Sequence, residues 1–253
     1  MRLLVLEDSK AVSAEALSIL QKQLAEKPDS AIGYPTGASV TELYAMMREA
    51  SLNGELDLSP TSAFQLDDYL GLPITHPQRF AHMLDEQVFQ TCGVSESRIH
   101  LFGENPAFSD ADGIAYDRAI QHAGGLDLLL LGIGANGHVG FNEPGSDFAA
   151  GTHRVGLTDE MRKSAAPSFK NPDEVPHFAA TMGIGSILAA KKLVLLAMGE
   201  GKASAITSML TQPASPDCPA SALTAHADLT VLLDRKAASR LTEQQISEIG
   251  GAR

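Results

Sequence analysis

The sequence predicts an α/β fold built on a doubly wound, mostly parallel sheet with helices on both faces. Two observations lead to this fold class. Short apolar segments bounded by turn residues recur along the chain and are expected to form strands, at residues 3–6, 31–34, 63–66, 99–102, 126–131, 193–198 and 229–233. Amphipathic segments of helical periodicity lie between them, at residues 9–24, 39–52, 77–90, 110–121 and 202–210.

The segment LDLLLL at 126–131 gives the clearest indication of the sheet type. It is too apolar for a strand with one wet face, and it suits a central parallel strand covered on both sides by helices. In such Rossmann-like sheets the ligand crevice lies outside the carboxyl ends of the strands. The loops that follow the strands are therefore where chemistry is expected.

The composition favours one soluble domain spanning residues 1–253. The chain is 44% hydrophobic and 20% charged, and it lacks an apolar run long enough to cross a membrane. Glu7 and Asp8 interrupt the first apolar stretch, so a signal peptide is not expected, and Cys92 and Cys218 lack metal or redox spacing. We expect a cytoplasmic location.

The charge balance narrows the class of partner. The chain has 19 basic and 31 acidic residues, with a formal charge of −12, which argues against nucleic acid and anionic membranes. A small anion can still be bound locally, by backbone N–H groups and one or two cations.

Two loops have the residues of a phosphate site. The loop GYPTGAS precedes an amphipathic helix and offers Thr36, Gly37, Ala38 and Ser39, and the loop MGEGKASA places Lys202 at a helix start. A helix N-terminus has free N–H groups and a dipole that favour an anion. A plain serine N-cap and a solvated lysine are the alternatives.

The loop FQLDDYLGLP contains the adjacent carboxylates Asp67 and Asp68 after an apolar strand. Neighbouring side chains of an extended segment point in opposite directions, so one carboxylate can enter the crevice while the other faces away or caps a neighbour. A partly desolvated carboxylate can remove a proton next to a carbonyl. A helix-capping or solvated pair is the alternative.

The loop LLLLGIGANGHVGFNEPG has glycines at 132, 134, 137 and 140 around Asn136, His138 and Glu143. Its G-x-G-x-x-G spacing resembles a dinucleotide fingerprint, but no helix-forming run follows at once and His138 lies inside the turn. Nicotinamide binding is therefore not favoured. A lone histidine is usually structural, but a carboxylate five residues later makes His138 a candidate acid–base group.

The ordered motifs PTGAS, LDDYLGLP, GIGANGHVGFNEPG and GEGKASA together resemble the glucosamine-6-phosphate deaminase/isomerase family over nearly the whole chain. The segments THPQRFAHML and TMGIGSILAAKKLVLLAMGEGK are also similar to this family. The resemblance implies a hydrolytic deaminase and isomerase of amino-sugar metabolism, in N-acetylglucosamine catabolism. It would convert glucosamine 6-phosphate to fructose 6-phosphate and ammonia.

The resemblance also implies roles for individual residues. Asp67 would be the base at C2, His138 would assist ring opening, and Glu143 would orient His138, with Asn136 third in the relay. Asn136 stands where some members of the family have aspartate, which leaves this relay with one fewer negative charge. The implied substrate-binding residues are Thr36, Gly37, Ala38, Ser39, Asp68, Gly134 and Lys202. No metal and no cofactor are expected, because the site has one histidine and scattered carboxylates.

One departure concerns a mobile lid expected at about 160–178. The family commonly has an arginine there that contacts the phosphate, whereas this chain reads RKSAAPSFKNP and has Pro167. Arg162, Lys163 and Lys170 are the cations that could compensate. The segments GGLDLLLLG, GEGK and CPAS are also similar to the galactosamine-6-phosphate branch, so the C4 epimer is the alternative substrate.

Two other functions are less favoured by the sequence. A 6-phosphogluconolactonase would have an arginine after the acidic pair, where this chain has Tyr69, and it would lack FNEP at 141–144. A non-catalytic sugar-phosphate sensor would have lost Asp67 or His138. The expected partner is a hexosamine 6-phosphate, and a homo-oligomer is left open.

Overall fold

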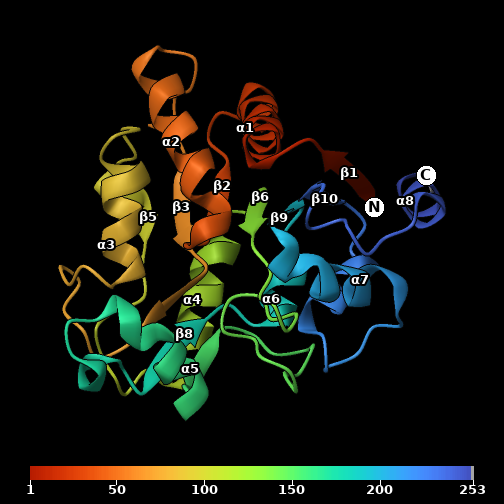
Figure 1. Cartoon of the computed structure of the whole chain (residues 1–253). Helices are drawn as coiled ribbons and strands as arrows, with labels where there is room; N and C mark the ends of the chain where they lie inside the picture. The colour runs from red at the N-terminus through yellow and green to blue at the C-terminus, as the bar shows by residue number, and fades with distance from the viewer. Residues whose placement is uncertain (252–253) are drawn as a thin grey trace.

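The central sheet has seven parallel strands in the order β1-β10-β9-β6-β2-β3-β5 (Figure 1). The computed structural model describes residues 1–251. The strands are β1 (Arg2–Leu6), β2 (Ala31–Tyr34), β3 (Ser62–Gln65), β5 (Ile99–His100), β6 (Leu128–Leu131), β9 (Leu193–Ala197) and β10 (Leu229–Asp234). Each overlaps one of the segments expected from the sequence, so the predicted sheet is confirmed.

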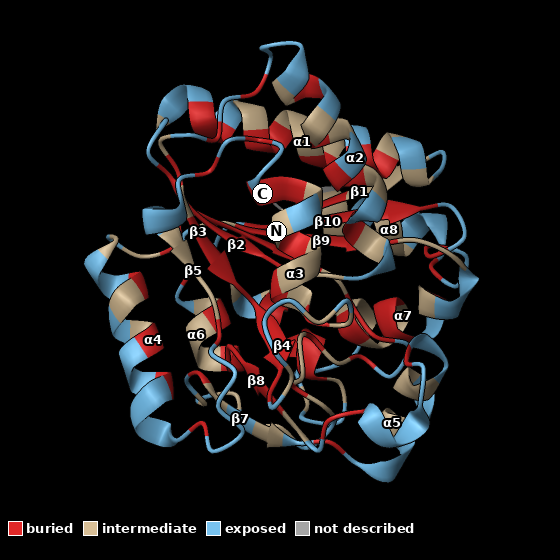
Figure 2. Cartoon of the chain, turned by 90° about the vertical axis from the view of Figure 1, so that its left-hand side faces the viewer, coloured by how far each residue is buried: buried red, intermediate tan, exposed pale blue. Residues whose placement is uncertain are grey.

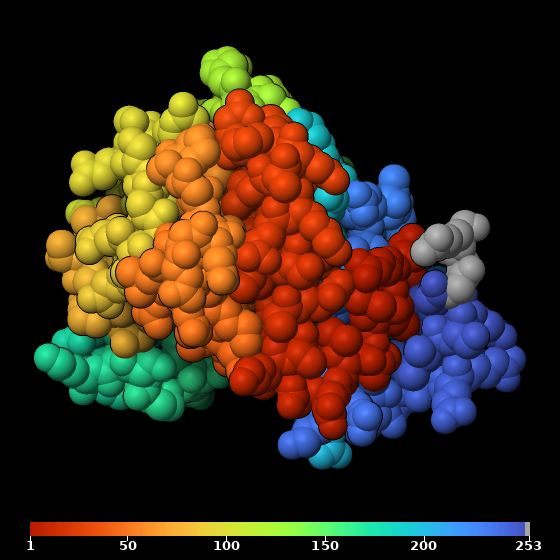
Figure 3. All heavy atoms as spheres, turned by 90° about the horizontal axis from the view of Figure 1, so that it is seen from above, coloured from red at the N-terminus to blue at the C-terminus, as the bar shows by residue number. Residues whose placement is uncertain are grey.

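The helices cover both faces of this sheet, as a doubly wound fold requires (Figure 2). The structure has α1 (Ser9–Glu26), α2 (Ala38–Leu52), α3 (Phe80–Leu84), α4 (Asp110–His122), α5 (Asp159–Ala165), α6 (Ile184–Leu188), α7 (Ala203–Thr211) and α8 (Glu243–Gly251). Figure 3 looks onto the face covered by α1 and α2, in red and orange. The other face is covered by α4, α6, α7 and α8.

Alternate residues of the central strand separate the two halves of the core. Leu128 and Leu130 pack with α1 and α2, whereas Leu129 and Leu131 pack with α4, α6 and α7. All four leucines are fully buried. Burial on both faces explains why this strand is apolar at every position.

A second sheet was not predicted. It has three antiparallel strands in the order β4 (Asp67–Tyr69), β8 (Phe178–Thr181) and β7 (His153–Gly156). The segment expected as an acidic loop is its first strand, where Asp67 pairs with Thr181. The main-chain N–H of Met182 donates to the carbonyl of Leu66, which ties this small sheet to the end of β3.

Several boundaries differ from those expected. The helix expected at 77–90 begins at Phe80 and continues as a π-helical turn at Asp85–Phe89. The helix expected at 202–210 begins with a 3₁₀ turn at Glu200–Lys202. Helices α5, α6 and α8 were not predicted. The single-domain organisation and the mobility of the segment at 160–178 stay predictions.

Candidate active site

The four loops that contain the predicted site residues meet at the carboxyl ends of the central strands. Strands β9, β6, β2 and β3 are neighbours, and the loops GEGK, GIGANGH, PTGAS and LDD leave their carboxyl ends in that order. The direction of winding reverses between β2 and β6, because the chain proceeds from β2 to β3 on one side and from β6 to β9 on the other. Such a switch point is the usual ligand site of this fold class.

The loop after β2 meets the glycine loop after β6. Helix α2 begins at Ala38 after Gly37, whose φ of 109° is a conformation that favours glycine. The hydroxyl of Ser39 lies against Gly132, where an added Cβ would come within 3.2 Å of Oγ. The predicted phosphate-binding residues Thr36, Gly37, Ala38 and Ser39 therefore lie together at the switch point, at the N-terminus of a 15-residue helix.

Lys202 lies at the start of α7, in the loop that follows β9, the strand next to β6. It is half-buried, and burial lowers the pKa of its ammonium group. No carboxylate of residues 1–251 lies within ion-pair distance of it. A partly desolvated cation without a protein counter-ion is suited to binding an anion from outside the chain.

The glycine loop brings Asn136, His138 and Glu143 together as predicted. Nδ1 of His138 lies 3.0 Å from Oε1 of Glu143, although the ring is not aligned for a full hydrogen bond. The amide of Asn136 donates to Oε2 of Glu143 at 2.6 Å. The pKa of Glu143 is lowered, first by its contact with His138 and then, against the effect of burial, by Asn136. Glu143 is therefore held as an anion beside the imidazole, and its role in orienting His138 stays a prediction.

Gly134 makes room for the ring of His138. A Cβ at this position would come within 2.3 Å of Cε1 and Nδ1 of the imidazole. The N–H of Gly134 also donates to the carbonyl of His138, which closes the turn. The structure thus gives Gly134 a role in seating His138, and its predicted contact with substrate stays a prediction.

Asp67 is buried and has no hydrogen-bond donor among the described residues. Its side chain is 8% exposed, and Oδ2 lies 3.6 Å from the point where a Cβ on Gly140 would stand. The carboxyl group therefore faces the glycine loop that contains His138. Burial, and then the charge of Asp68, raise the pKa of Asp67 to about 8. A carboxylate in this state is a much stronger base than one in water.

Asp68 does not reach the crevice, and its expected contact with substrate is not supported. It is fully buried and forms an ion pair with Nε of the equally buried Arg79 at 2.9 Å. Its oxygens also accept hydrogen bonds from the N–H groups of Phe80 and Ala81, which begin α3. Asp68 is thus the capping member of the acidic pair, the alternative that the sequence left open, and its protein donors leave no accessible oxygen for a ligand.

Two polar residues of this edge were missed by the sequence reasoning. Thr181 is fully buried beside Asp67, and its Oγ1 accepts a hydrogen bond from the N–H of Phe141 at 3.2 Å. Asp234 ends β10 and accepts hydrogen bonds from the turn that leads to Lys202. A carboxylate directly after an apolar strand was the available signal for Asp234, whereas the position of Thr181 depends on long-range strand pairing.

The expected lid folds over the small sheet. Phe169 is buried, and its ring lies 5.9 Å from that of Tyr69, the residue that follows the acidic pair. Pro167, at the position of the missing arginine, is exposed. The guanidinium of Arg162 donates to the carbonyl of Val175 within the same segment. Lys163 and Lys170 are exposed and remain the candidates for compensation.

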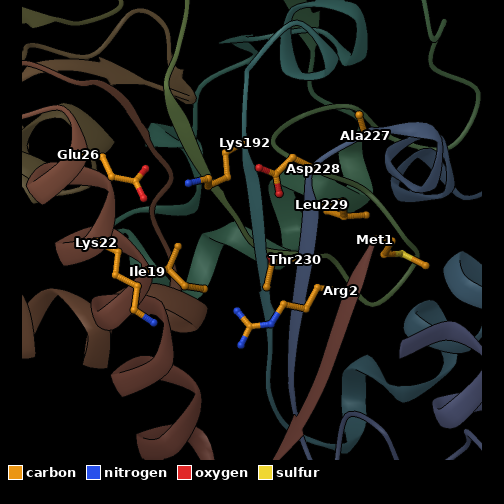
Figure 4. Close-up of a pocket in the computed structure, with 10 residues that line it drawn as sticks. All are labelled: Met1, Arg2, Ile19, Lys22, Glu26, Lys192, Ala227, Asp228, Leu229 and Thr230. Atoms are coloured by element: carbon orange, nitrogen blue, oxygen red, sulfur yellow. The ribbon is translucent and has the colours of Figure 1, made fainter. Parts of the chain in front are cut away.

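One cavity lies away from these loops. It has a volume of about 420 Å³ and is found at the amino ends of β1 and β10, with Arg2, Lys22 and Lys192 on its wall (Figure 4). None of the predicted site residues lines this cavity. The candidate active site is therefore identified by the residues that meet at the carboxyl ends of the strands. In residues 1–251 no cluster of three or more His, Cys, Asp or Glu side chains could hold a metal ion, and no helix is long and apolar enough to span a membrane.

Comparison with known proteins identifies the family. Residues 7–232 match the family of glucosamine-6-phosphate isomerases and 6-phosphogluconolactonase, and the chain belongs to it. Among its relatives, the glucosamine-6-phosphate deaminase of Shewanella woodyi is 41% identical over 247 residues, 96% of this chain and 92% of the relative. The enzyme of the same name from Bifidobacterium longum is 42% identical over 224 residues, 85% of this chain and 83% of the relative.

Solved structures agree with this assignment. A monomeric glucosamine-6-phosphate deaminase superposes with a TM-score of 0.90 at 36% identity, over 94% of this chain and 99% of the other. The 6-phosphogluconolactonase of Trypanosoma brucei gives a TM-score of 0.75 at 18% identity, over 95% of this chain and 98% of the other. That second similarity concerns the fold alone.

Proposed function

We propose that this protein is a glucosamine-6-phosphate deaminase that isomerises its substrate and releases ammonia. The observation that carries the proposal is Asp67, a buried carboxyl group without a hydrogen-bond donor, facing the loop of His138. Similarity to relatives that are named as deaminases supports the same reaction.

The first half of the reaction is an aldose–ketose isomerisation. His138, oriented by Glu143, moves the proton that opens the sugar ring. Asp67 then removes the proton from C2, next to the C1 carbonyl, and returns it to C1. The double bond that results joins C2 to nitrogen, and the phosphate is held by the loop 36–39 and by Lys202. The raised pKa of Asp67 suits it both to take up this proton and to deliver it.

The second half is hydrolytic. Water adds to the C2 imine, and the C2–N bond breaks to release ammonia and leave the ketone of fructose 6-phosphate. Atoms balance with one water consumed and one ammonia released, and no step requires a metal or a cofactor. A cytoplasmic enzyme of amino-sugar breakdown, in N-acetylglucosamine catabolism, fits this chemistry.

Galactosamine 6-phosphate is the second candidate substrate, since Pro167 replaces the lid arginine and the sequence has features of that branch. Ammonia release should be measured for both hexosamine 6-phosphates at equal concentrations, with 6-phosphogluconolactone hydrolysis measured in parallel. We expect the highest kcat/KM with glucosamine 6-phosphate. Hydrolysis of the lactone without ammonia release would overturn the proposal, and phosphate binding without turnover would favour a sensor.

A further inference from the structure

The turn between β9 and α7 contains hydrogen-bond donors that could bind an anion. Gly199 begins it with a φ of 85°, a conformation that favours glycine, and the 3₁₀ turn Glu200–Lys202 follows. The N–H groups of Glu200 and Gly201 donate to no acceptor among the described residues. Together with the half-buried ammonium group of Lys202, these N–H groups can donate hydrogen bonds to a bound anion.

A carboxylate from the next strand fixes this turn. Asp234 ends β10, which pairs with β9, and its side chain is 6% exposed. The N–H of Gly199 is shared between its two oxygens, at 3.1 Å to Oδ1 and 3.0 Å to Oδ2. Oδ1 also accepts a hydrogen bond from the N–H of Ala237 at 2.6 Å. Within residues 1–251 no cation forms an ion pair with Asp234.

The two hydrogen bonds have different consequences. The bond from Ala237 closes the turn that follows Asp234 itself, which is an ordinary local role for an aspartate. The bond from Gly199 joins the end of β10 to the turn that follows β9. Gly199 is the first residue of that turn, which contains Lys202. Charge-assisted hydrogen bonds of a buried carboxylate are strong and directional, so they can hold the turn in one orientation.

We propose that Asp234 is a positioning residue for phosphate binding, acting through Gly199 on the Glu200–Lys202 turn. The inference rests on the proposed function, because it takes the phosphate of the substrate as the anion. Asp234 does not itself contact the phosphate, since two negative groups repel each other. Its effect is geometric: it holds the free N–H groups and Lys202 toward one point.

This geometry and the charge of Asp234 predict opposite results for Asp234→Asn. Removal of a nearby negative charge alone would strengthen the binding of an anion. Loss of positioning would weaken it, because asparagine offers one neutral acceptor oxygen in place of two charged ones, so the shared hydrogen bond from Gly199 becomes weaker. The direction of the change therefore identifies the role.

The test is titration calorimetry of inorganic phosphate against the full chain, together with steady-state deamination kinetics. Asp228→Asn is the matched control, because Asp228 is exposed and lies immediately before the first residue of the same strand. We expect Asp234→Asn to raise the Kd for phosphate and the KM for the sugar phosphate about tenfold, the loss of roughly one charge-assisted hydrogen bond, with kcat changed less than about threefold. Asp228→Asn should leave all three values unchanged.

A double variant tests whether Asp234 acts through the turn. If it does, Asp234→Asn combined with Lys202→Met should weaken phosphate binding by less than the product of the two single effects. Multiplicative effects, unchanged binding, or tighter binding in a folded Asp234→Asn would overturn the inference. If Asp234→Asn does not fold, Asp234→Ser, which keeps one acceptor, is measured in the same way with the same expected direction. A wild-type protein that binds phosphate but releases no ammonia would contradict the proposed function alone.

Discussion

Two buried aspartates at opposite edges of the central sheet show how the same side chain serves structure or chemistry. Asp127 lies just before β6, at the amino edge, and is 4% exposed. It accepts hydrogen bonds from Lys27 at 2.6 Å, from Lys191 at 2.7 Å and from the N–H of Ala31 at 2.8 Å. Burial alone would raise its pKa, but these three donors outweigh burial and lower it.

Asp67, at the carboxyl edge, has the opposite surroundings. It is 8% exposed, and its side chain accepts no hydrogen bond from the described residues. The donors nearby bind to its neighbour Asp68 instead, which keeps its negative charge next to Asp67. Burial and that neighbouring charge raise its pKa to about 8. The fold thus provides hydrogen-bond donors for the structural aspartate, Asp127, and provides none for Asp67, the residue that we propose as the base.

The largest expected effect comes from Asp67→Asn, which keeps the shape and removes the base. We expect kcat to fall about 10²–10⁴-fold with KM nearly unchanged, and exchange of the C2 proton with solvent to disappear. Steady-state ammonia release and exchange in deuterated water measure the two effects. A variant that keeps more than about a tenth of the wild-type turnover would remove Asp67 from this role.

The same substitution at Asp127 should have the reverse outcome. Asp127→Asn leaves Lys27, Lys191 and Ala31 with a weaker acceptor, so we expect the free energy of unfolding to fall by about 1–3 kcal/mol. The kcat of the folded enzyme should stay unchanged, because Asp127 lies at the other edge of the sheet. Urea denaturation and activity at equal folded concentration test this expectation. A loss of turnover without a loss of stability would contradict the division of roles.

The raised pKa of Asp67 predicts a dependence of stability on pH. The folded protein keeps a proton that the unfolded chain, with a carboxyl pKa near 3.8, releases. The stability associated with protonated Asp67 is fully present below about pH 4 and is lost as pH rises through about 8. Asp67→Asn should therefore gain stability relative to wild type as pH increases over this window. Urea denaturation of both proteins at several pH values measures the difference, and parallel curves would be contrary to the assigned pKa.

Much of this architecture could be predicted from the sequence, because a strand buried on both faces must be apolar throughout. Leu128–Leu131 is such a strand, and its position located the glycine loop and His138. The small sheet could not be found in this way. Strand β4 has three residues, two of them aspartates, and its pairing with β8 joins residues more than 100 positions apart. Local periodicity contains no signal for such pairing.

The site was predictable to the extent that its residues lie in loops with unusual composition. Asn136, His138 and Glu143 meet because a short glycine-rich turn leaves them few other arrangements. The division of labour between Asp67 and Asp68 could be stated only as alternatives, since it depends on Arg79, which reaches Asp68 from the next helix. The position of Asp234 at the end of an apolar strand was visible in the sequence, but its contact with Gly199, 35 positions away, was not.

Neither aspartate is expected to need a metal ion. Asp127 is neutralised by two lysines, and the carboxylates of the catalytic edge do not cluster with other metal-ligating side chains in residues 1–251. Dialysis against EDTA should therefore leave kcat and KM unchanged, measured against an untreated sample of the same preparation. Loss of activity that is restored by a divalent cation would contradict the acid–base mechanism proposed for Asp67.

The smallest expected effect concerns regulation. Some members of the family are activated by N-acetylglucosamine 6-phosphate at a separate site that uses basic residues after FNEPG. Here the corresponding stretch, residues 146–158, has Arg154 as its one permanent cation. Its guanidinium donates to the carbonyl of Pro106 at 3.0 Å and lies 4.4 Å from the centre of the Phe178 ring.

A second phosphate site needs charge-assisted donors, commonly more than one, and Asp147 in the same stretch opposes an anion. Because Arg154 is already engaged, binding an effector there would break its present contacts. We therefore expect hyperbolic kinetics that do not change when the acetylated sugar phosphate is added. Initial rates over a wide range of substrate concentrations, with and without the effector, test this. A sigmoidal curve that becomes hyperbolic when the effector is added would contradict this prediction and reveal a regulatory site. If the prediction holds, Arg154→Ala should also give a hyperbolic curve, both with and without the effector.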